Sequence, residues 1–303
     1  MTAADTVSAG TAIAIPTAGD PTHPRGRIIR GLLHDRTAVV GFVLVSVLTL
    51  AAVFAPLLSP HDPDAVDVAR KFLAPSREFP LGTDHLGRDV LSRLLFGARL
   101  SIGSTCVAVV FITAVGIGVG MLIGWFGGAL DTVFGRFLDM FLALPTFLLA
   151  LAVTALLGPG LRNVMVAIVL AWWPIYARIV RSAVLSERSK PYVESARAVG
   201  SSSARIIRRH LLPNILGPVI VLTTLDLGIV MLAISGLSFL GLGVSPPAAE
   251  WGSMLSEGRT YLSVAPNMMF FPGAAIFLMV LGFNLLGDGL RDVLDPRTRG
   301  RRR

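Results

Sequence analysis

The chain has 303 residues, of which 53% are hydrophobic and 15% charged, with a mean hydropathy of +0.70 and a formal net charge of +8. This composition excludes an ordinary soluble domain, and the length allows several membrane spans. Excess positive charge can indicate nucleic-acid binding, but in a membrane protein basic residues usually mark the cytoplasmic side. We therefore expect the lipid bilayer, and no nucleic acid, as a partner.

Residues 1–30 are predicted to form a disordered cytoplasmic tail. The first 20 residues are rich in Ala, Thr, Ser and Gly and contain no sustained apolar core. We therefore do not expect a cleavable signal peptide. Arg25, Arg27 and Arg30 precede the first long apolar run, and such a basic cluster holds the N-terminus in the cytoplasm.

Six apolar segments are predicted to cross the membrane, because most of them suit a helix of about 20 residues. They are Thr37–Leu58, Ser101–Trp125, Phe137–Leu157, Val164–Val180, Ile215–Leu240 and Met268–Leu286. With both termini in the cytoplasm, 19 of the 27 Lys and Arg residues lie on that side. The predicted fold is an all-α membrane protein with six transmembrane helices.

The unit 31–100 is predicted to hold the first span and an outer amphipathic loop. This loop contains LGTDHLGRDVLSRLLFGARLS, which starts at Leu81. Val90 and Leu94 alternate there with Arg88 and Arg93, which is typical of a helix that lies along the membrane surface. A solvated connector is the alternative.

The core unit, 101–290, contains two features that need explanation inside a membrane. Gly116, Gly120 and Gly124 form a stripe at i, i+4 and i+8 that permits close helix contact. Asp226 lies in the fifth span, where a charge costs about 2.5–3.5 kcal/mol. We predict that Asp226 lines the translocation path and attracts a cationic group. The alternative is a carboxylate held by Thr223, by another subunit or in its protonated form.

A polar, basic stretch, SKPYVESARAVGSSSARIIRRHLLPN, occupies residues 189–214 between the fourth and fifth spans. Tyr192–Val199 is predicted to be a short helix that ends at a left-handed Gly200. Ala204–Leu212 is predicted to be a second helix, which Pro213 interrupts. On this second helix the arginines share one face and the apolar side chains take the other; they are Arg205, Arg208 and Arg209 against Ile206, Ile207 and Leu211.

This stretch resembles the EAA loop of ABC-importer permeases. Glu194, Ser195 and Ala196 are followed by Gly200 four residues later and then by Leu212 and Pro213; Ser195 replaces the usual Ala. The His-Leu-Leu-Pro-Asn ending is similar to that of the peptide-transporter branch. In this family the loop is a coupling helix that inserts into a cleft of a separate ATPase subunit. The resemblance thus implies a coupling set of Tyr192, Glu194, Ser195, Ala196, Gly200, His210, Leu212 and Pro213. An ordinary basic loop between membrane helices is the alternative.

Three further strings resemble the C-type subunit of dipeptide and oligopeptide permeases. They are the string that starts at Leu81, GLSFLGLGVSPPAAEWGSML from Gly236, and FNLLGDGLRDVLDPRTRG from Phe283. The second implies an outer surface near the substrate-binding protein, formed by Pro246, Pro247 and Trp251, although Trp251 can also be a plain interfacial anchor. The third implies that residues 291–303 form a basic cytoplasmic tail.

The sequence gives no support for catalysis by this chain. The only lysines, Lys71 and Lys190, do not follow a P-loop glycine pattern. The five histidines are scattered without the spacing of metal ligands. We therefore expect no enzyme activity, no metal and no bound cofactor in this chain.

The resemblance implies the permease subunit of an ATP-driven peptide importer in the bacterial inner membrane. Expected partners are a homologous B-type permease, two ATPase subunits or one fused ATPase that use ATP and Mg, and an extracytoplasmic substrate-binding protein. Nickel, glutathione and haem are alternative substrates. A secondary transporter that works without nucleotide and a membrane-embedded enzyme are the alternative classes.

Overall fold

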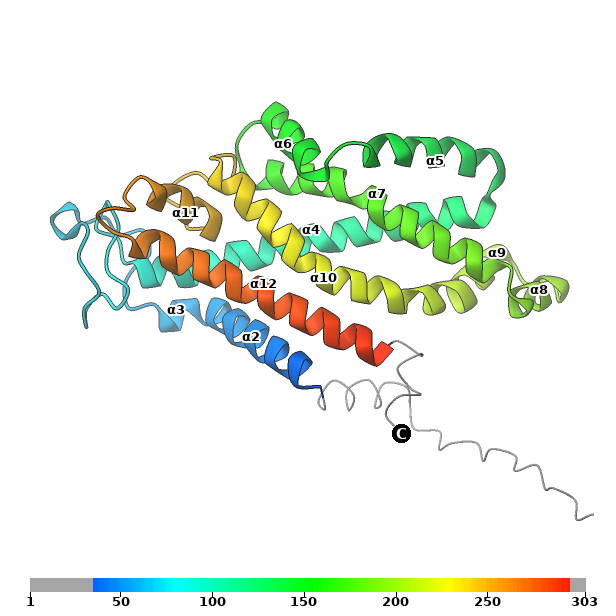
Figure 1. The fold of residues 1–303 in the computed structure, drawn as a ribbon, viewed down its shortest axis with the longest axis horizontal. Coiled ribbons are helices and arrows are strands. Elements are labelled where there is room, and N and C mark those ends of the chain that lie inside the picture. The colour runs from blue at the N-terminus through cyan, green and yellow to red at the C-terminus, as the bar shows by residue number, and fades with distance from the viewer. Residues whose placement is uncertain (1–34, 295–303) are drawn as a thin grey trace, which may run out of the picture.

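The computed structural model describes residues 35–294, which form an elongated bundle of helices (Figure 1). The predicted tail 1–30 and all but the first four residues of the predicted tail 291–303 lie outside the described residues. Within the described part, five helical stretches are long and apolar enough to cross a membrane. They are α2 (Arg36–Val53), α4 (Val90–Phe126), α7 (Leu161–Arg188), α9 to α10 (Ser203–Phe239) and α12 (Asn267–Leu294).

The predicted third span, Phe137–Leu157, is broken in the structure. It falls on α5 (Gly128–Leu142) and α6 (Thr146–Leu157), which meet at an angle of 86°. Pro145 is the N-cap residue of α6. Proline disfavours helical backbone at the residue before it and removes a hydrogen-bond donor, so the chain turns here. Six crossings result only if this bent pair counts as one span.

The predicted helix break at Pro213 is wrong. A four-residue α9 (Ser203–Ile206) leads through a π-helical turn, Ile207–Leu211, into α10 (Leu212–Phe239). Pro213 lies in the first turn of α10, where its missing N–H is tolerated. Because the π-turn shifts the hydrogen-bond register, the chain passes this proline without leaving the helix. Asn214 Nδ2 donates to the carbonyl of His210 at 2.8 Å.

The predicted surface helix around Val90 is also wrong, because these residues are the first turns of α4. Asp89 caps this 37-residue helix, and its Oδ2 accepts from Ser92 N at 2.9 Å. Arg88 and Arg93 are only 2% and 1% exposed, so they do not lie along a membrane surface. The predicted unit boundary at residues 100 and 101 therefore falls inside one helix.

The glycine stripe packs α4 directly against α7. A Cβ added at Gly116 would lie 2.2 Å from Cβ of Tyr176, and one at Gly120 would lie 2.6 Å from the carbonyl oxygen of Ala177. At Gly124 the nearest atom, Cβ of Val184, would be 2.8 Å away. None of these positions has room for a side chain, which confirms a packing role for the stripe.

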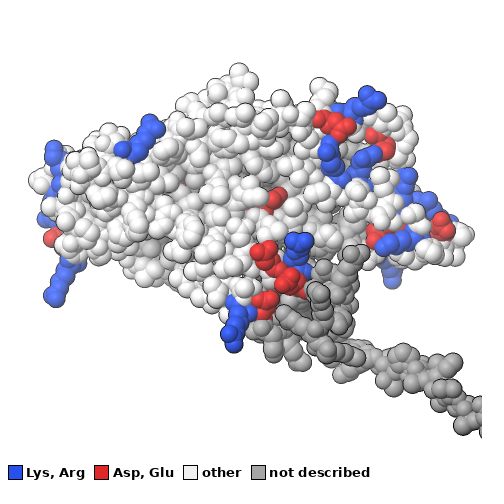
Figure 2. Space-filling model, viewed as in Figure 1, with Lys and Arg blue, Asp and Glu red and all other residues white. Residues whose placement is uncertain are grey.

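Two small assemblies lie at opposite ends of the bundle (Figure 1). We call the first the cap; it comprises residues 59–89, with the short helix η1 (Val68–Arg70), and residues 240–259, with α11 (Trp251–Arg259). The second, the bent loop, comprises residues 189–214 and contains α8 (Pro191–Ala198) and α9. Charged residues gather at the two ends of the long axis and in a third group at the lower edge, near the start of α2 and the end of α12 (Figure 2). The remaining helix, α3 (Ala55–Leu58), joins α2 to the cap.

Candidate functional site

The bent loop turns at Gly200, as predicted. The backbone N–H of Gly200 donates to the carbonyl of Arg197 at 2.9 Å, and that of Ser201 donates to the carbonyl of Ala196 at 3.0 Å. Gly200 has φ +77°. This pair of bonds around a left-handed glycine is a Schellman motif, which ends a helix and redirects the chain. The corner is therefore built by local backbone geometry.

Helix α8 is attached to the bundle by one face. Val193 is fully buried and Ala196 is 8% exposed, and both belong to the main apolar core. Glu194 and Ser195 are exposed on the other side of the helix. Of the predicted E-A-A residues, Ala196 thus anchors the helix, while Glu194 and Ser195 face outward.

A polar cluster joins the start of α8 to the end of α7 and the start of α10. Tyr192 Oη donates to Glu187, and Asn214 Nδ2 donates to Tyr192 Oη at 3.1 Å. The rings of Tyr192 and His210 lie 6.0 Å apart. Burial, together with the hydrogen bond to Glu187, raises the pKa of Tyr192 above its ordinary value, and the hydrogen bond to Glu187 raises the pKa of Lys190. Two predicted coupling residues, Tyr192 and His210, therefore meet at this junction.

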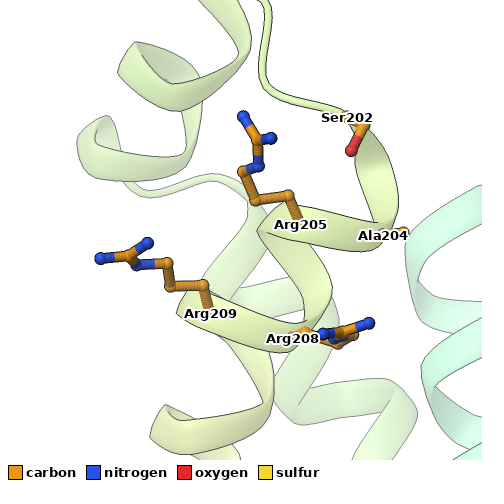
Figure 3. A pocket seen from close by; sticks show the side chains of 5 residues that line it. All are labelled: Ser202, Ala204, Arg205, Arg208 and Arg209. Atoms are coloured by element: carbon orange, nitrogen blue, oxygen red, sulfur yellow. The ribbon is translucent and has the colours of Figure 1, made fainter.

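The other face of the bent loop is strongly basic. The second helix buries Ile206 and Leu211 and leaves its arginines exposed, as predicted. An open concavity of about 490 Å³ is lined by Ser202, Ala204, Arg205, Arg208 and Arg209, and Figure 3 shows the three arginine side chains projecting from the helix. We call these three arginines the arginine face. Residues 189–214 hold more basic than acidic side chains, so the face is not neutralised by its own loop.

Asp226 is buried inside the bundle and is 7% exposed. The hydroxyl of Tyr176 is a polar neighbour of Asp226, and the hydroxyls of Thr113 and Thr223 are neighbours of Tyr176. Thr113 Oγ1 and Thr223 Oγ1 lie 3.3 Å apart, and Tyr176 Oη is buried without a hydrogen-bond partner. Sequence reasoning did not include Tyr176, although a tyrosine hydroxyl inside an apolar helix needs a polar neighbour. The role of Asp226 in translocation stays a prediction.

The cap exposes only part of the predicted docking set. Pro246 and Pro247 are exposed. Trp251 is 1% exposed and its Nε1 donates to the carbonyl of Leu94 at 2.9 Å. The expectation that Trp251 lies on an outer surface or anchors an interface is therefore wrong. Instead, Trp251 fixes α11 to α4.

Buried ion pairs hold the cap together. Arg88 Nε lies 2.6 Å from Asp84 Oδ2, and Arg88 Nη2 lies 2.9 Å from Glu257 Oε2. Arg93 Nη2 is 3.4 Å from the same Glu257 oxygen. Sequence reasoning missed this network, because Glu257 lies 169 residues beyond Arg88.

The cap also contains a group that resembles a metal site. Among the described residues, the ligand atoms of Asp84, His85 and Glu257 lie within 4.8 Å of one another. Arg88 and Arg93 already engage both carboxylates. Two guanidinium groups oppose the charge of a cation there, so these residues do not fit a metal.

The apolar bundle, bent loop and cap define the membrane-spanning part of a transporter. Residues 116–300 match the family model described as the inner membrane component of binding-protein-dependent transport systems, and residues 24–75 match the N-terminal transmembrane domain of oligopeptide transport permease C. The chain belongs to this family of ABC-importer permeases. The predicted C-type resemblance is confirmed.

Similar proteins are named for several different substrates. The dipeptide transport system permease protein DppC of Alkalihalophilus pseudofirmus is 41% identical over 90% of this chain and 90% of that protein. The nickel transport system permease protein NikC of Escherichia coli K12 is 42% identical over 87% of this chain and 96% of NikC. The glutathione transport system permease protein GsiD of Pectobacterium atrosepticum is 40% identical, with coverages of 88% and 89%.

A solved structure shares the fold. The inward-facing MetNI methionine ABC transporter matches with a TM-score of 0.53 and 22% identity, over 66% of this chain and 96% of the matched chain. At this identity the match supports the architecture alone. It agrees with the predicted permease fold.

Proposed function

We propose that this chain is the non-catalytic permease subunit of an ATP-driven importer in the bacterial inner membrane, with di- or oligopeptides as substrate. The bent loop then faces the cytoplasm with both termini, and the cap faces outward. The observation that carries the proposal is the seating of α8. Its buried side is fixed to the core by Val193, while Glu194 and Ser195 are presented outward beside the corner at Gly200.

An ATPase subunit is the partner that best fits the bent loop. Arg205, Arg208 and Arg209 are exposed, whereas Ile206 and Leu211 of the same segment are buried against the bundle. Three exposed guanidinium groups on one short segment complement an acidic protein surface.

The transport cycle follows from this placement. ATP and Mg are bound in the partner ATPase subunits, and their closure moves α8 as a rigid body. A second, B-type permease completes the path between the two chains. Nucleotide binding thus biases a membrane bundle that has an outward-open and an inward-open state.

Asp226 and Tyr176 are the groups we assign to the path. A carboxylate and a hydroxyl that are buried in an apolar bundle suit a cationic group, such as a peptide amino terminus. The match to the oligopeptide permease C domain favours peptides. Nickel and glutathione, the substrates named for two relatives, are the alternatives, and haem is a further one.

The cap is assigned to the substrate-binding protein. Pro246 and Pro247 are exposed on the segment between α10 and α11. The buried ion pairs below them make this segment a firm surface, because Arg93 Nη1 also donates to the carbonyl of Pro247 at 3.2 Å. A delivering protein can thus dock on an ordered outer face.

Co-purification tests the ATPase partner. The chain is tagged in its native host, and the complex is isolated in mild detergent. We expect an ATP-hydrolysing subunit to accompany the wild-type chain, and its recovery to fall when all three residues of the arginine face are changed to Glu. Arg162→Glu, which reverses one exposed charge at the opposite end of α7, is the control for the site of the change. A wild-type assembly without any ATPase contradicts the proposal and favours a secondary transporter driven by an ion gradient.

Sidedness is tested with a unique thiol. Ser201→Cys is made in a Cys106→Ser background, because Cys106 is the only native cysteine. A membrane-impermeant maleimide should label the introduced thiol in inside-out vesicles and not in intact spheroplasts. Labelling in spheroplasts alone would place the bent loop outside and refute the orientation.

A further inference from the structure

The coupling helix is joined to α4 as well as to its neighbours in sequence. The guanidinium carbon of Arg197, in the last turn of α8, lies 4.5 Å from the ring centroid of Trp125. Trp125 is the penultimate residue of α4 and is 8% exposed. A cation this close to an indole face is attracted by the ring quadrupole. The end of α4 thus carries a contact with the element that docks the ATPase.

A second arginine secures the same end of α4. Arg188, the last residue of α7, donates from Nη1 to the carbonyls of Gly124 at 3.0 Å and Trp125 at 3.4 Å. These carbonyls lie in the last turn of their own helix, where a cation is favoured by the helix dipole. The ends of α4 and α7 are therefore bound to each other just before α8 begins.

The last third of α4 cannot slide independently of α7. The glycine stripe brings the two backbones into contact over about 8 residues, or about 12 Å of helix. At each of these glycines even a single added Cβ has no room. Interfaces packed this closely move as one body more readily than they deform.

The other end of α4 is built into the cap. The carbonyl of Leu94 accepts from Trp251 Nε1, and Arg93 is paired with Glu257 of α11. Between these contacts and Trp125, α4 is one helix without an internal proline. A 37-residue helix is about 55 Å long, so one continuous element reaches from the bent loop to the cap.

We propose that α4 is the element that carries the ATPase-driven movement of α8 to the cap, and that Arg197 and Trp125 are the positioning residues that join α8 to it. This inference rests on the proposed function, because it needs an ATPase that moves α8. On this view the peptide link from α7 through Ser189 and Lys190 is not sufficient to transmit the movement of α8. The contact between Arg197 and Trp125 is also required. Coupling between α8 and the cap has to be measured directly, as the response of the cap end of α4 to nucleotide at the ATPase.

The test uses the whole complex with its ATPase subunits, reconstituted in lipid nanodiscs. A reporter thiol is placed near the cap end of α4 by Arg99→Cys in the Cys106→Ser background; Arg99 is exposed. The rate of labelling by a charged maleimide is measured without nucleotide and after trapping with ATP and orthovanadate. With the native joint, we expect trapping to change the labelling rate by at least about fivefold.

Substitutions then separate transmission from assembly. Arg197→Gln and Trp125→Leu should each remove most of the change in labelling rate, while the ATPase subunits still co-purify and still hydrolyse ATP. Arg197→Lys and Trp125→Phe keep a cation and an aromatic face and should retain it. The double change Arg197→Gln with Trp125→Leu should be no worse than either single change, as expected for one shared contact. Arg136→Gln, an arginine on α5, is the matched control.

Three results overturn the inference. In the first, trapping leaves the reporter unchanged even with the native joint, so that the cap end of α4 takes no part in the cycle. In the second, the response survives both Arg197→Gln and Trp125→Leu. In the third, Arg197→Gln releases the ATPase, which would make Arg197 a docking residue. Absence of any ATPase from the wild-type complex is a separate failure, because it refutes the proposed function itself.

Discussion

Replacing Gly200 by valine tests whether the direction of α8 matters for coupling. Gly200 has φ +77°, a conformation that β-branched residues rarely adopt. A Cβ at this position would meet no atom within 4 Å. The perturbation is therefore one of backbone conformation alone, without a steric clash.

The size of the effect follows from the backbone. A non-glycine residue held in the left-handed region costs about 1–3 kcal/mol, and valine should lie near the upper end. A cost of about 3 kcal/mol shifts the balance between the native corner and a relaxed one by about 160-fold. Alanine should cost about 1–2 kcal/mol, and asparagine, which tolerates this region, should cost less. Transport should therefore fall in the order Gly, Asn, Ala, Val.

The assay compares uptake and ATP hydrolysis in the reconstituted complex at equal abundance of the chain. Gly118→Val is the matched control, since a Cβ at Gly118 also meets nothing within 4 Å and its φ is not in the left-handed region. We expect Gly200→Val to lose coupled uptake and Gly118→Val to keep it. If Gly200→Val retains full uptake and full substrate-stimulated hydrolysis, the reasoning from the corner to coupling is refuted.

Three further substitutions test the cap, the packing and the path. Glu257→Ala removes the acceptor shared by Arg88 and Arg93 and should lower the stability by about 3–5 kcal/mol, measured by thermal unfolding in detergent. Asp64 is 48% exposed and lies 3.8 Å from Arg93, so the control Asp64→Ala should change the stability by less than about 1 kcal/mol. Equal losses for the two variants would contradict a buried network. Gly116→Val must displace Tyr176 and should destabilise the chain by about 1–3 kcal/mol or more, seen as reduced monodisperse yield; a yield like that of wild type would disprove the close packing. Asp226→Asn removes the buried charge and should reduce uptake of a dipeptide with a free amino terminus. The expected reduction is about tenfold or more, because a hydrogen bond to a charged group contributes about 1.5–3 kcal/mol. Unchanged uptake and selectivity at equal abundance of the chain would show that Asp226 does not line the path.

The parts of the fold that depend on residues close together in the sequence were predictable from the sequence. The Schellman corner needs only a glycine after an amphipathic turn, and the position of Gly200 indicates it. The glycine stripe is visible as an i, i+4 pattern at Gly116 and Gly120. The family of the chain followed from the motif around Glu194, and the comparisons confirm it.

The parts that depend on tertiary contacts were not predictable in this way. Arg88 and Arg93 look like the polar side of a surface helix until Glu257 is brought beside them by α11. The permease resemblance placed Trp251 on an outer surface, with an interfacial anchor as the alternative, yet Trp251 is buried and donates to α4. Pro213 suggested a break, but the π-turn before it keeps the helix continuous.

The ion pairs of the cap impose an order on its folding during translation. Arg88 leaves the ribosome 169 residues before Glu257, an interval of about 8–34 s at 5–20 residues per second. During this time Arg88 and Arg93 lack Glu257, and Asp84 and Asp64 are the other carboxylates with which they pair in the structure. The ion pairs with Glu257 can form only after α11 has been translated, so a chain that stalls before α11 leaves Arg88 and Arg93 without the carboxylate that they share.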